Sequence, residues 1–212
     1  MVFTNVEGNG SKFLFTGKLA DLVAPIFYNE ETGEFKFCEF NTDGSSAMNE
    51  DRELNNAIKL TKAYQAFAKN REIRTFELFD SWVEEFAEIY KEYAKKFRQA
   101  DKAESPEKSD ESDRSEVPNV AIIDFLEHAT YSEFQVFQER FKAHGIPCVI
   151  CDVRNIRWDG QHCYTPEGMR IDAIYRRAVT SDILNHYDEV QDLIEAVKCN
   201  GVCLVGEFRT QI

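Results

Sequence analysis

The sequence predicts an α/β fold. The first observation is that uniformly apolar runs alternate with amphipathic patterns after residue 119, at the spacing typical of strand–helix–strand crossovers. The second is that 43% of the 212 residues are hydrophobic and 17 are Phe, which is enough for a packed core. We therefore expect a Rossmann-like, mainly parallel sheet with helices on both faces, plus an N-terminal portion of strands and two helices.

The N-terminal portion begins with three expected strands, in "SKFLFTG", "LVAPIFYN" and "EFKFCEF", separated by polar or turn-forming residues. Apolar residues then recur at helical spacing from about residue 47 to 70, which predicts a first helix. A second helix is expected from about Leu78 to Ala100, because its aromatic and aliphatic residues keep the same period. The acidic, Ser-rich stretch that follows predicts a disordered loop.

In the second half, "NVAIIDF", "IPCVICDV", "IDAIYRR" and "VCLVGEF" predict buried strands. Thr130 and Glu133 form the pattern of a capping box at the start of the first intervening helix. Asp159-Gly160 predicts a short hairpin before the third strand, and a further helix is expected to stop at Asn200. All units are assigned to one domain, in four parts: N-terminal strands at 1–46, a helical pair at 47–100, the acidic loop at 101–118 and the α/β unit at 119–212.

The composition narrows the possible functions. The formal net charge is −13, which argues against general binding to nucleic acid or to anionic membranes, since both need a basic face. No apolar run approaches the roughly 20 residues of a membrane span, and no signal peptide is evident, so we expect a cytoplasmic protein.

The six cysteines are interpreted as free, buried thiols of a reduced compartment. Cys148 and Cys151 form a CxxC pattern, but an odd offset on a strand places the two side chains on opposite faces, which is unsuitable for a shared metal. A thiol-based redox function is an alternative hypothesis. It predicts that replacing these two cysteines abolishes activity.

The stretch "FKFCEFNTDGSSAMNE" carries the first candidate site. Glu39 and Asn41 lie two residues apart on an expected strand, so their side chains face the same way about 7 Å apart. Two oxygen ligands at that separation suit Mg²⁺. The following turn, with Ser45 and Ser46, offers the N–H groups and hydroxyls that hold a carboxylate or phosphate. The alternative interpretation of the Glu-x-Asn pair is a solvated edge strand.

Two further stretches, "EHATYS" and "YRR", also follow expected strands. Ligands of open α/β sheets bind at the carboxyl ends of strands, so the three stretches are expected to lie near one crevice. Arg176 and Arg177 should point to opposite faces, and at most one enters that crevice to pair with a substrate carboxylate. A surface ion pair is the alternative. The usual nucleotide fingerprints do not occur in the sequence.

The stretch "FCEFNTDGSSAMNE" resembles the Glu-x-Asn-plus-serines signature of the glutathione synthetase and glutathionylspermidine synthetase group. The segments from "VAIIDF" to "RNIRWDG", then "IDAIYRRAVTSD" and "NGVCLVGEFRTQI", follow in the order of that group's substrate-binding, pre-ATP-grasp domain. The resemblance covers roughly residues 20 to 212. It implies a carboxylate–amine ligase that activates an acid with ATP as an acyl phosphate, which an amine then attacks.

The resemblance also implies roles for the first stretch. Glu39 and Asn41 would help to hold Mg²⁺ beside the ATP phosphates. Ser45 and Ser46 would bind the carboxylate of a peptide substrate.

For the later stretches, the resemblance implies a substrate contact by Arg177, which matches better than Arg176. The segment after "VAIIDF" would line the pocket through Thr130 or Ser132, with Glu127 as a further candidate.

The group's ATP-grasp lobes would begin where this sequence ends, so we expect a domain of a longer ligase that is inactive alone. Expected partners are a small carboxylate or peptide, an amine or polyamine, and the ATP-grasp lobes in cis. The resemblance also allows a homodimer. The alternative function is a stand-alone Rossmann-like module that binds a small molecule or a partner without catalysis.

Overall fold

The centre of the protein is a four-stranded parallel sheet. The computed structural model describes residues 26–29, 31–37, 43–44, 48–75, 77–104 and 115–208. The strands follow the order β4-β3-β8-β9. They are Val120–Asp124 (β3), Cys148–Asp152 (β4), Ala173–Arg176 (β8) and Cys203–Val205 (β9). The predicted α/β class with a parallel sheet is therefore confirmed.

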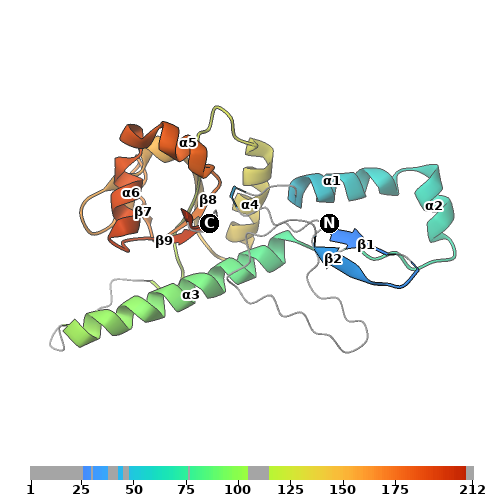
Figure 1. Cartoon of the computed structure of the whole chain (residues 1–212), viewed down its shortest axis with the longest axis horizontal. Helices are drawn as coiled ribbons and strands as arrows, with labels where there is room; N and C mark the ends of the chain where they lie inside the picture. The colour runs from blue at the N-terminus through green and yellow to red at the C-terminus, as the bar shows by residue number, and fades with distance from the viewer. Residues whose placement is uncertain are drawn as a thin grey trace.

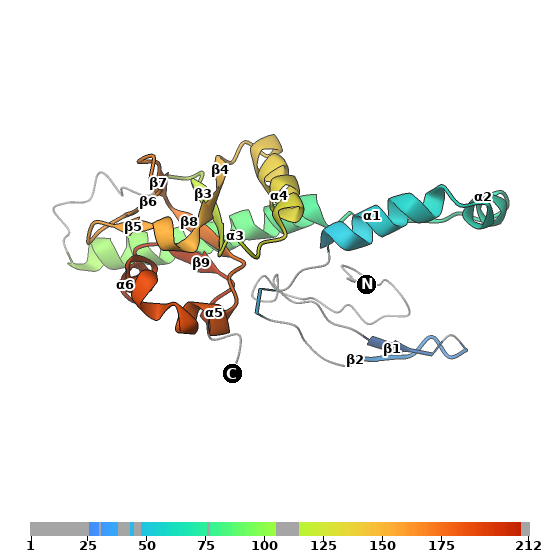
Figure 2. The same ribbon diagram turned by 90° about the horizontal axis from the view of Figure 1, so that it is seen from above.

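Helices cover both faces of this sheet, and Figure 2 shows α4 on one side and α5 and α6 on the other. Val120 and Ile122 of β3 pack on the face shared with α3 and α4, whereas Ala121 and Ile123 pack toward α5 and α6. Both sides of β3 are buried, which explains its continuous apolar sequence. The helices are Phe79–Glu104 (α3), Tyr131–Ala143 (α4), Thr180–Asn185 (α5) and Gln191–Lys198 (α6).

Aromatic rings hold α3 against the sheet. Phe86 is fully buried, and its ring centroid lies 5.0 Å from that of Phe141 in α4 and 6.3 Å from that of Tyr175 in β8. The ring centroid of Trp82 lies 5.0 Å from that of Tyr175. The helix runs to Glu104, into the expected acidic loop. Among the described residues, neither α3 nor any other helix is long and apolar enough to cross a membrane.

The single helix expected before α3 is two helices, α1 (Met48–Lys59) and α2 (Lys62–Ala68). Thr61 causes the break. Its hydroxyl donates to the carbonyl of Ile58 and accepts from the N–H of Tyr64, so it ends one helix and caps the next. Neither helix has a buried residue, and Figure 1 shows both projecting from the α/β unit.

Strands β1 (Ile26–Tyr28) and β2 (Phe35–Phe37) form their own antiparallel hairpin. Among the described residues β2 pairs with β1 and not with a strand of the main sheet. The short turn favours this pairing, because the Asn29 side chain accepts from two backbone N–H groups. The strand expected in "SKFLFTG" lies outside the described residues.

A small antiparallel sheet lies between β4 and β8 in the chain. It consists of β5 (Arg157–Trp158), β6 (Cys163–Tyr164) and β7 (Arg170–Ile171), so the expected hairpin carries one more strand than predicted. The turn is formed as expected. Asp159 accepts from two backbone N–H groups, and Gly160 has a φ of +99°.

Phe86→Ala should lower the free energy of unfolding by about 3–5 kcal/mol, because it leaves a cavity between α3, α4 and β8. Urea denaturation followed by circular dichroism measures the loss. Phe67→Ala is the matched control, since Phe67 is 52% exposed on α2 and its removal should cost less than about 1 kcal/mol. Equal losses for the two variants would contradict the packing of α3 on the sheet.

Candidate functional site

The sheet has a topological switch point between β3 and β8. The chain leaves β3 through α4 toward β4 on one side, and leaves β8 through α5 and α6 toward β9 on the other. Neighbouring strands with such diverging connections open a crevice at their carboxyl ends, where ligands of open α/β sheets bind. β3 ends at Asp124 and β8 ends at Arg176, so the candidate site lies around these residues.

Arg176 is fully buried at this edge and is ion-paired. Its Nη1 lies 2.8 Å from Oδ1 of Asp43, and its guanidinium also donates to the carbonyls of Ala178 and Gly206. The ring centroid of Phe208 lies 4.8 Å from the guanidinium carbon. A buried guanidinium needs such partners, because its desolvation is costly. Arg176 therefore fixes neighbouring loops.

Asp43 is fastened to the start of α5. Its Oδ2 accepts from the backbone N–H of Thr180 at 2.8 Å, and its Oδ1 accepts from the Thr180 hydroxyl at 3.0 Å. The next residue, Gly44, has a φ of +59°, and a Cβ there would lie 2.5 Å from the carbonyl oxygen of Arg177. Only glycine fits this contact without strain. The turn is thus seated on the carboxyl end of β8.

Arg177 makes a second buried ion pair, with Glu133 at the start of α4. Its Nη2 lies 3.0 Å from Oε2 of Glu133, and its Nη1 donates to the hydroxyl of Tyr175 at 3.1 Å. The other carboxylate oxygen of Glu133 accepts from the backbone N–H of Asn49 at 3.4 Å. The predicted capping box with Thr130 is therefore wrong: Thr130 makes no side-chain cap, and the Glu133 carboxylate binds a buried guanidinium instead.

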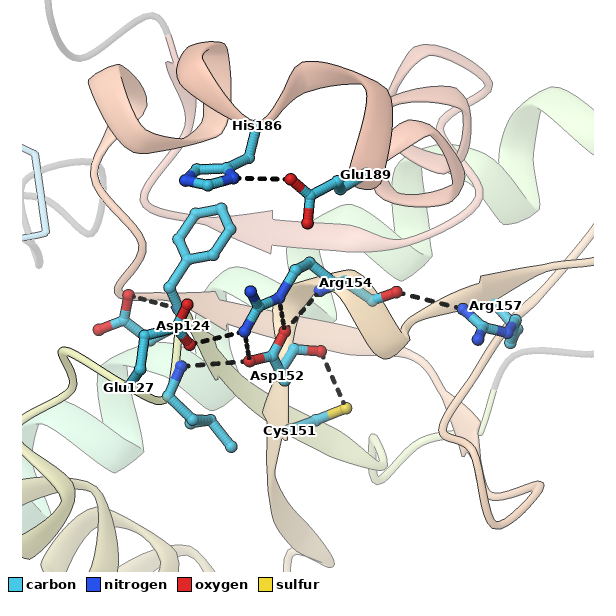
Figure 3. Close-up of polar contacts among 10 residues, drawn as sticks. Asp124, Glu127, Cys151, Asp152, Arg154, Arg157, His186 and Glu189 are labelled. Carbon is cyan, nitrogen blue, oxygen red and sulfur yellow. Dashed lines mark hydrogen bonds and ion pairs between the residues drawn. The ribbon is translucent and has the colours of Figure 1, made fainter.

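The carboxyl ends of β3 and β4 carry a third set of charges, shown in Figure 3. Asp152 accepts a forked pair of hydrogen bonds from Arg154, at 2.8 Å from Nε and 2.7 Å from Nη2. Arg154 also contacts Glu127 at 2.6 Å. The hydrogen bond from Arg154 lowers the pKa of Asp152. Sequence reasoning missed Asp152 and Arg154, although "CDVR" follows a buried strand and so carried the signal.

Asp124 is the last residue of β3 and lies at the switch point, near the charges of Asp152 and Arg177. Burial raises its pKa above the ordinary value, while the hydrogen bond from the backbone N–H of Phe125 and the charge of Arg177 act in the opposite direction. The negative charge of Asp182 reinforces the rise. A half-buried carboxyl with a raised pKa can exchange protons closer to neutrality than an exposed one, or pair with an incoming cation.

A hollow of about 200 Å³ opens beside this cluster, between the chain after β4 and the start of α6. The Phe125 ring lies close by, 4.8 Å from the His186 ring and 5.4 Å from the Arg154 guanidinium. The walls carry both signs of charge. The charged residues that line the hollow are Arg154, Arg157, Asp188, Glu189 and Asp192.

The predicted site residues have different outcomes. Arg177 is only 6% exposed, and its guanidinium holds Glu133 and Tyr175. Thr130 and Ser132 are exposed at the start of α4, on the segment that follows β3. The structure thus places these three residues at or beside the carboxyl edge of the sheet. Four others lie outside the described residues, namely Glu39, Asn41, Ser45 and Ser46.

No cluster of three or more His, Cys, Asp or Glu side chains suited to a metal occurs among the described residues. The expected magnesium ligands are not among them, so their role stays a prediction. Cys199 is exposed, so the expectation of buried thiols is wrong for this residue. The thiols of Cys148 and Cys151 are unsuited to nucleophilic chemistry, because burial raises the pKa of Cys148 to about 12 and that of Cys151 to about 11. These two side chains pack in different cores, as expected for opposite faces of a strand.

Comparisons with known proteins give no family for this chain. No protein-family model matches it, and no curated protein matches it either.

Gly44→Ala should destabilise the protein more than Gly33→Ala does. Both glycines have positive φ, so each substitution should cost about 1 kcal/mol of backbone strain. Only Gly44 meets a backbone oxygen, and moving that contact should add about 1–2 kcal/mol. Thermal and urea denaturation of the two variants measure the difference. Equal losses would show that the turn is not seated on β8.

Asp124→Asn should raise the free energy of unfolding at neutral pH. The folded pKa is raised, so ionisation of Asp124 destabilises the fold above that pKa, and the penalty vanishes once both folded and unfolded states are protonated. The gain from the variant should therefore shrink as the pH falls toward the ordinary Asp pKa of about 3.9. Urea titrations across this pH range test it. A wild type more stable than the variant at pH 7 would contradict the prediction.

Proposed function

We propose that the chain is the substrate-binding domain of an ATP-dependent carboxylate–amine ligase, similar to the glutathione synthetase and glutathionylspermidine synthetase group. One observation carries the proposal. The turn at Asp43 and Gly44 contacts the chain at Arg176 and Arg177, so two stretches far apart in sequence meet at the carboxyl edge of the sheet. Glu133, which directly follows the third stretch, pairs with Arg177.

Recognition of the acid is assigned first to Ser45 and Ser46. In the sequence these serines follow directly after Gly44, which is seated on β8. Hydroxyl and backbone N–H groups in a glycine-containing turn suit a carboxylate. Arg177 remains a proposed substrate contact, but its guanidinium already holds Glu133, so a substrate carboxylate would have to share or displace that partner.

Recognition of the amine is assigned to the carboxylates at the end of β3. Asp124 is half-buried at the switch point, and Glu127 lies on the exposed segment that follows. Arg154 offsets the charge of Glu127, which leaves Asp124 as the stronger candidate for an amine or polyamine cation. Thr130 and Ser132 would add neutral hydrogen-bonding groups on the same side.

Glu39 and Asn41 would hold Mg²⁺, for which a carboxylate and an amide oxygen are suitable ligands. When bound beside ATP, the metal supplies neutralisation of charge on the transferring phosphoryl group. The chain's own residues would bind and orient the acid and the amine. ATP itself would be bound mainly by further lobes of the enzyme.

Calorimetric titration with glutathione, other γ-glutamyl peptides and polyamines tests the proposal. We expect saturable binding of a peptide that Ser46→Ala weakens by about tenfold, the scale of one lost hydrogen bond to a charged group. Ser115→Ala, remote from the carboxyl edge, is the matched control and should bind as wild type. Arg177→Ala is a poorer probe, because it would leave Glu133 buried without its cation.

ATP hydrolysis provides a second test of the proposal. The chain alone should not hydrolyse ATP in the presence of these ligands, whereas the gene product that includes ATP-grasp lobes should. Absence of binding by both the chain and the longer product would overturn the proposal. Binding without any ATP-dependent ligation in the longer product would favour a non-catalytic binding module.

A further inference from the structure

We propose that the hollow between the chain after β4 and the start of α6 binds a small zwitterion, with one ammonium and one carboxylate group, such as a free amino acid. Its volume of about 200 Å³ lies below the roughly 300–1,000 Å³ of pockets for drug-sized molecules, which suits a small ligand. None of the residues that line it is a proposed contact to the acid, the amine or the metal of the ligase. The site is therefore independent of the proposed function.

The two sides of the hollow carry opposite charges. One side is formed by residues 153–157 and has two arginines without any acidic residue, and the other is formed by residues 188–192 and has three acidic residues without any basic one. A ligand with one positive and one negative end matches this arrangement, with its carboxylate toward the arginines and its ammonium toward the acidic residues. The charged residues are Arg154 and Arg157 on the first side and Asp188, Glu189 and Asp192 on the second.

The arginine side has free donors. Arg157 donates from Nη1 to the carbonyls of Arg154 and Ile156, at 3.2 and 3.1 Å, and its Nε and Nη2 have no partner among the described residues. These two nitrogens form the edge of a guanidinium that binds a carboxylate through two parallel hydrogen bonds. Arg154 already uses the same edge for Asp152. Arg157 is therefore the main contact for the carboxylate of the ligand.

The acidic side has free acceptors. Oε1 of Glu189 lies 2.8 Å from Nδ1 of His186, and Oδ2 of Asp192 accepts from the backbone N–H of Trp158 at 3.2 Å. The other oxygen of each carboxylate, and both oxygens of Asp188, have no partner in the part of the chain that the structure describes. An ammonium group has three N–H donors and no acceptor, so these oxygens suit it.

The two sides do not neutralise each other. No ion pair joins them within the described ranges, and Arg154 and Glu189 instead pair with residues outside the hollow (Figure 3). The sides also have fixed bases, because Val153 on one and Val190 on the other are each 1% exposed and belong to the same core cluster. A zwitterion can therefore pair with both sides at once, and the walls need little ordering when it binds.

Titration with L-alanine tests the site, with the backbone amide signals of residues 153–157 and 188–192 followed by NMR. Propionate, which lacks the amino group, and ethylamine, which lacks the carboxylate, are the matched ligands. We expect saturable shifts with L-alanine, and binding about tenfold weaker for each of the other two, the scale of one lost contact between charged groups. Equal binding of either fragment would overturn the assignment to a zwitterion. Absence of saturable shifts in both segments would overturn the site itself.

Arg157→Gln and Asp188→Asn test the two sides separately, because each removes one charge and keeps a polar side chain. Arg74→Gln and Glu195→Gln are the matched controls, since both residues form exposed ion pairs outside the hollow. We expect L-alanine affinity to fall by about tenfold in Arg157→Gln and about threefold in Asp188→Asn, whose side has two further carboxylates. Both controls should bind as wild type.

Circular dichroism establishes that each variant is folded before the titration. If Arg157→Gln does not fold, Asp188→Asn still tests the site, because Asp188 is exposed and makes no hydrogen bond or ion pair with another described residue. Unchanged L-alanine affinity in a folded test variant would overturn the proposal.

Discussion

Two consecutive buried guanidinium groups constrain the structure more than any other feature. Arg176 ends strand β8 and Arg177 follows it directly, and a buried cation without a carboxylate is strongly unfavourable. Asp43 meets one of them and Glu133 meets the other, although they come from distant parts of the chain. Apolar packing alone explains why the helices cover the sheet. The requirement to neutralise two charges explains why the N-terminal segment is bound at its carboxyl edge.

Much of the fold could be predicted because burial leaves a local pattern. Each strand of the parallel sheet is an apolar run in the sequence, and the long period of α3 marks its packed face. The predictions failed where a single polar contact decides the structure. Thr61 breaks one expected helix into two through its own hydroxyl. The helix α5 spans only six residues and has Ile183 as its one buried side chain, too little for a periodic signal.

The candidate site was predictable in its location rather than in its contacts. The rule that ligands gather at the carboxyl ends of strands pointed to "YRR" and the segment after β3, and the structure places both at that edge of the sheet. Their role in binding stays a prediction. The rule could not show that Arg177 already has a carboxylate partner, because Glu133 was assigned to a local cap. Asp43 was not predicted as a site residue, because the Glu39/Asn41 pair before it and the Ser45/Ser46 pair after it carried the stronger signal. Its partner lies 133 positions away, a distance over which sequence patterns hold no information about pairing.

That separation has a consequence for how the protein is made. At the ordinary pace of translation, of about 5–20 residues per second, Asp43 leaves the ribosome roughly 7–27 s before Arg176 does. During this interval the attachment that holds the N-terminal segment cannot form. Leu54 on α1 and Leu60 between α1 and α2 are 61% and 79% exposed even in the folded chain, so burial on the sheet does not hold these helices in place meanwhile. Asp43 therefore docks only after β8 has been synthesised.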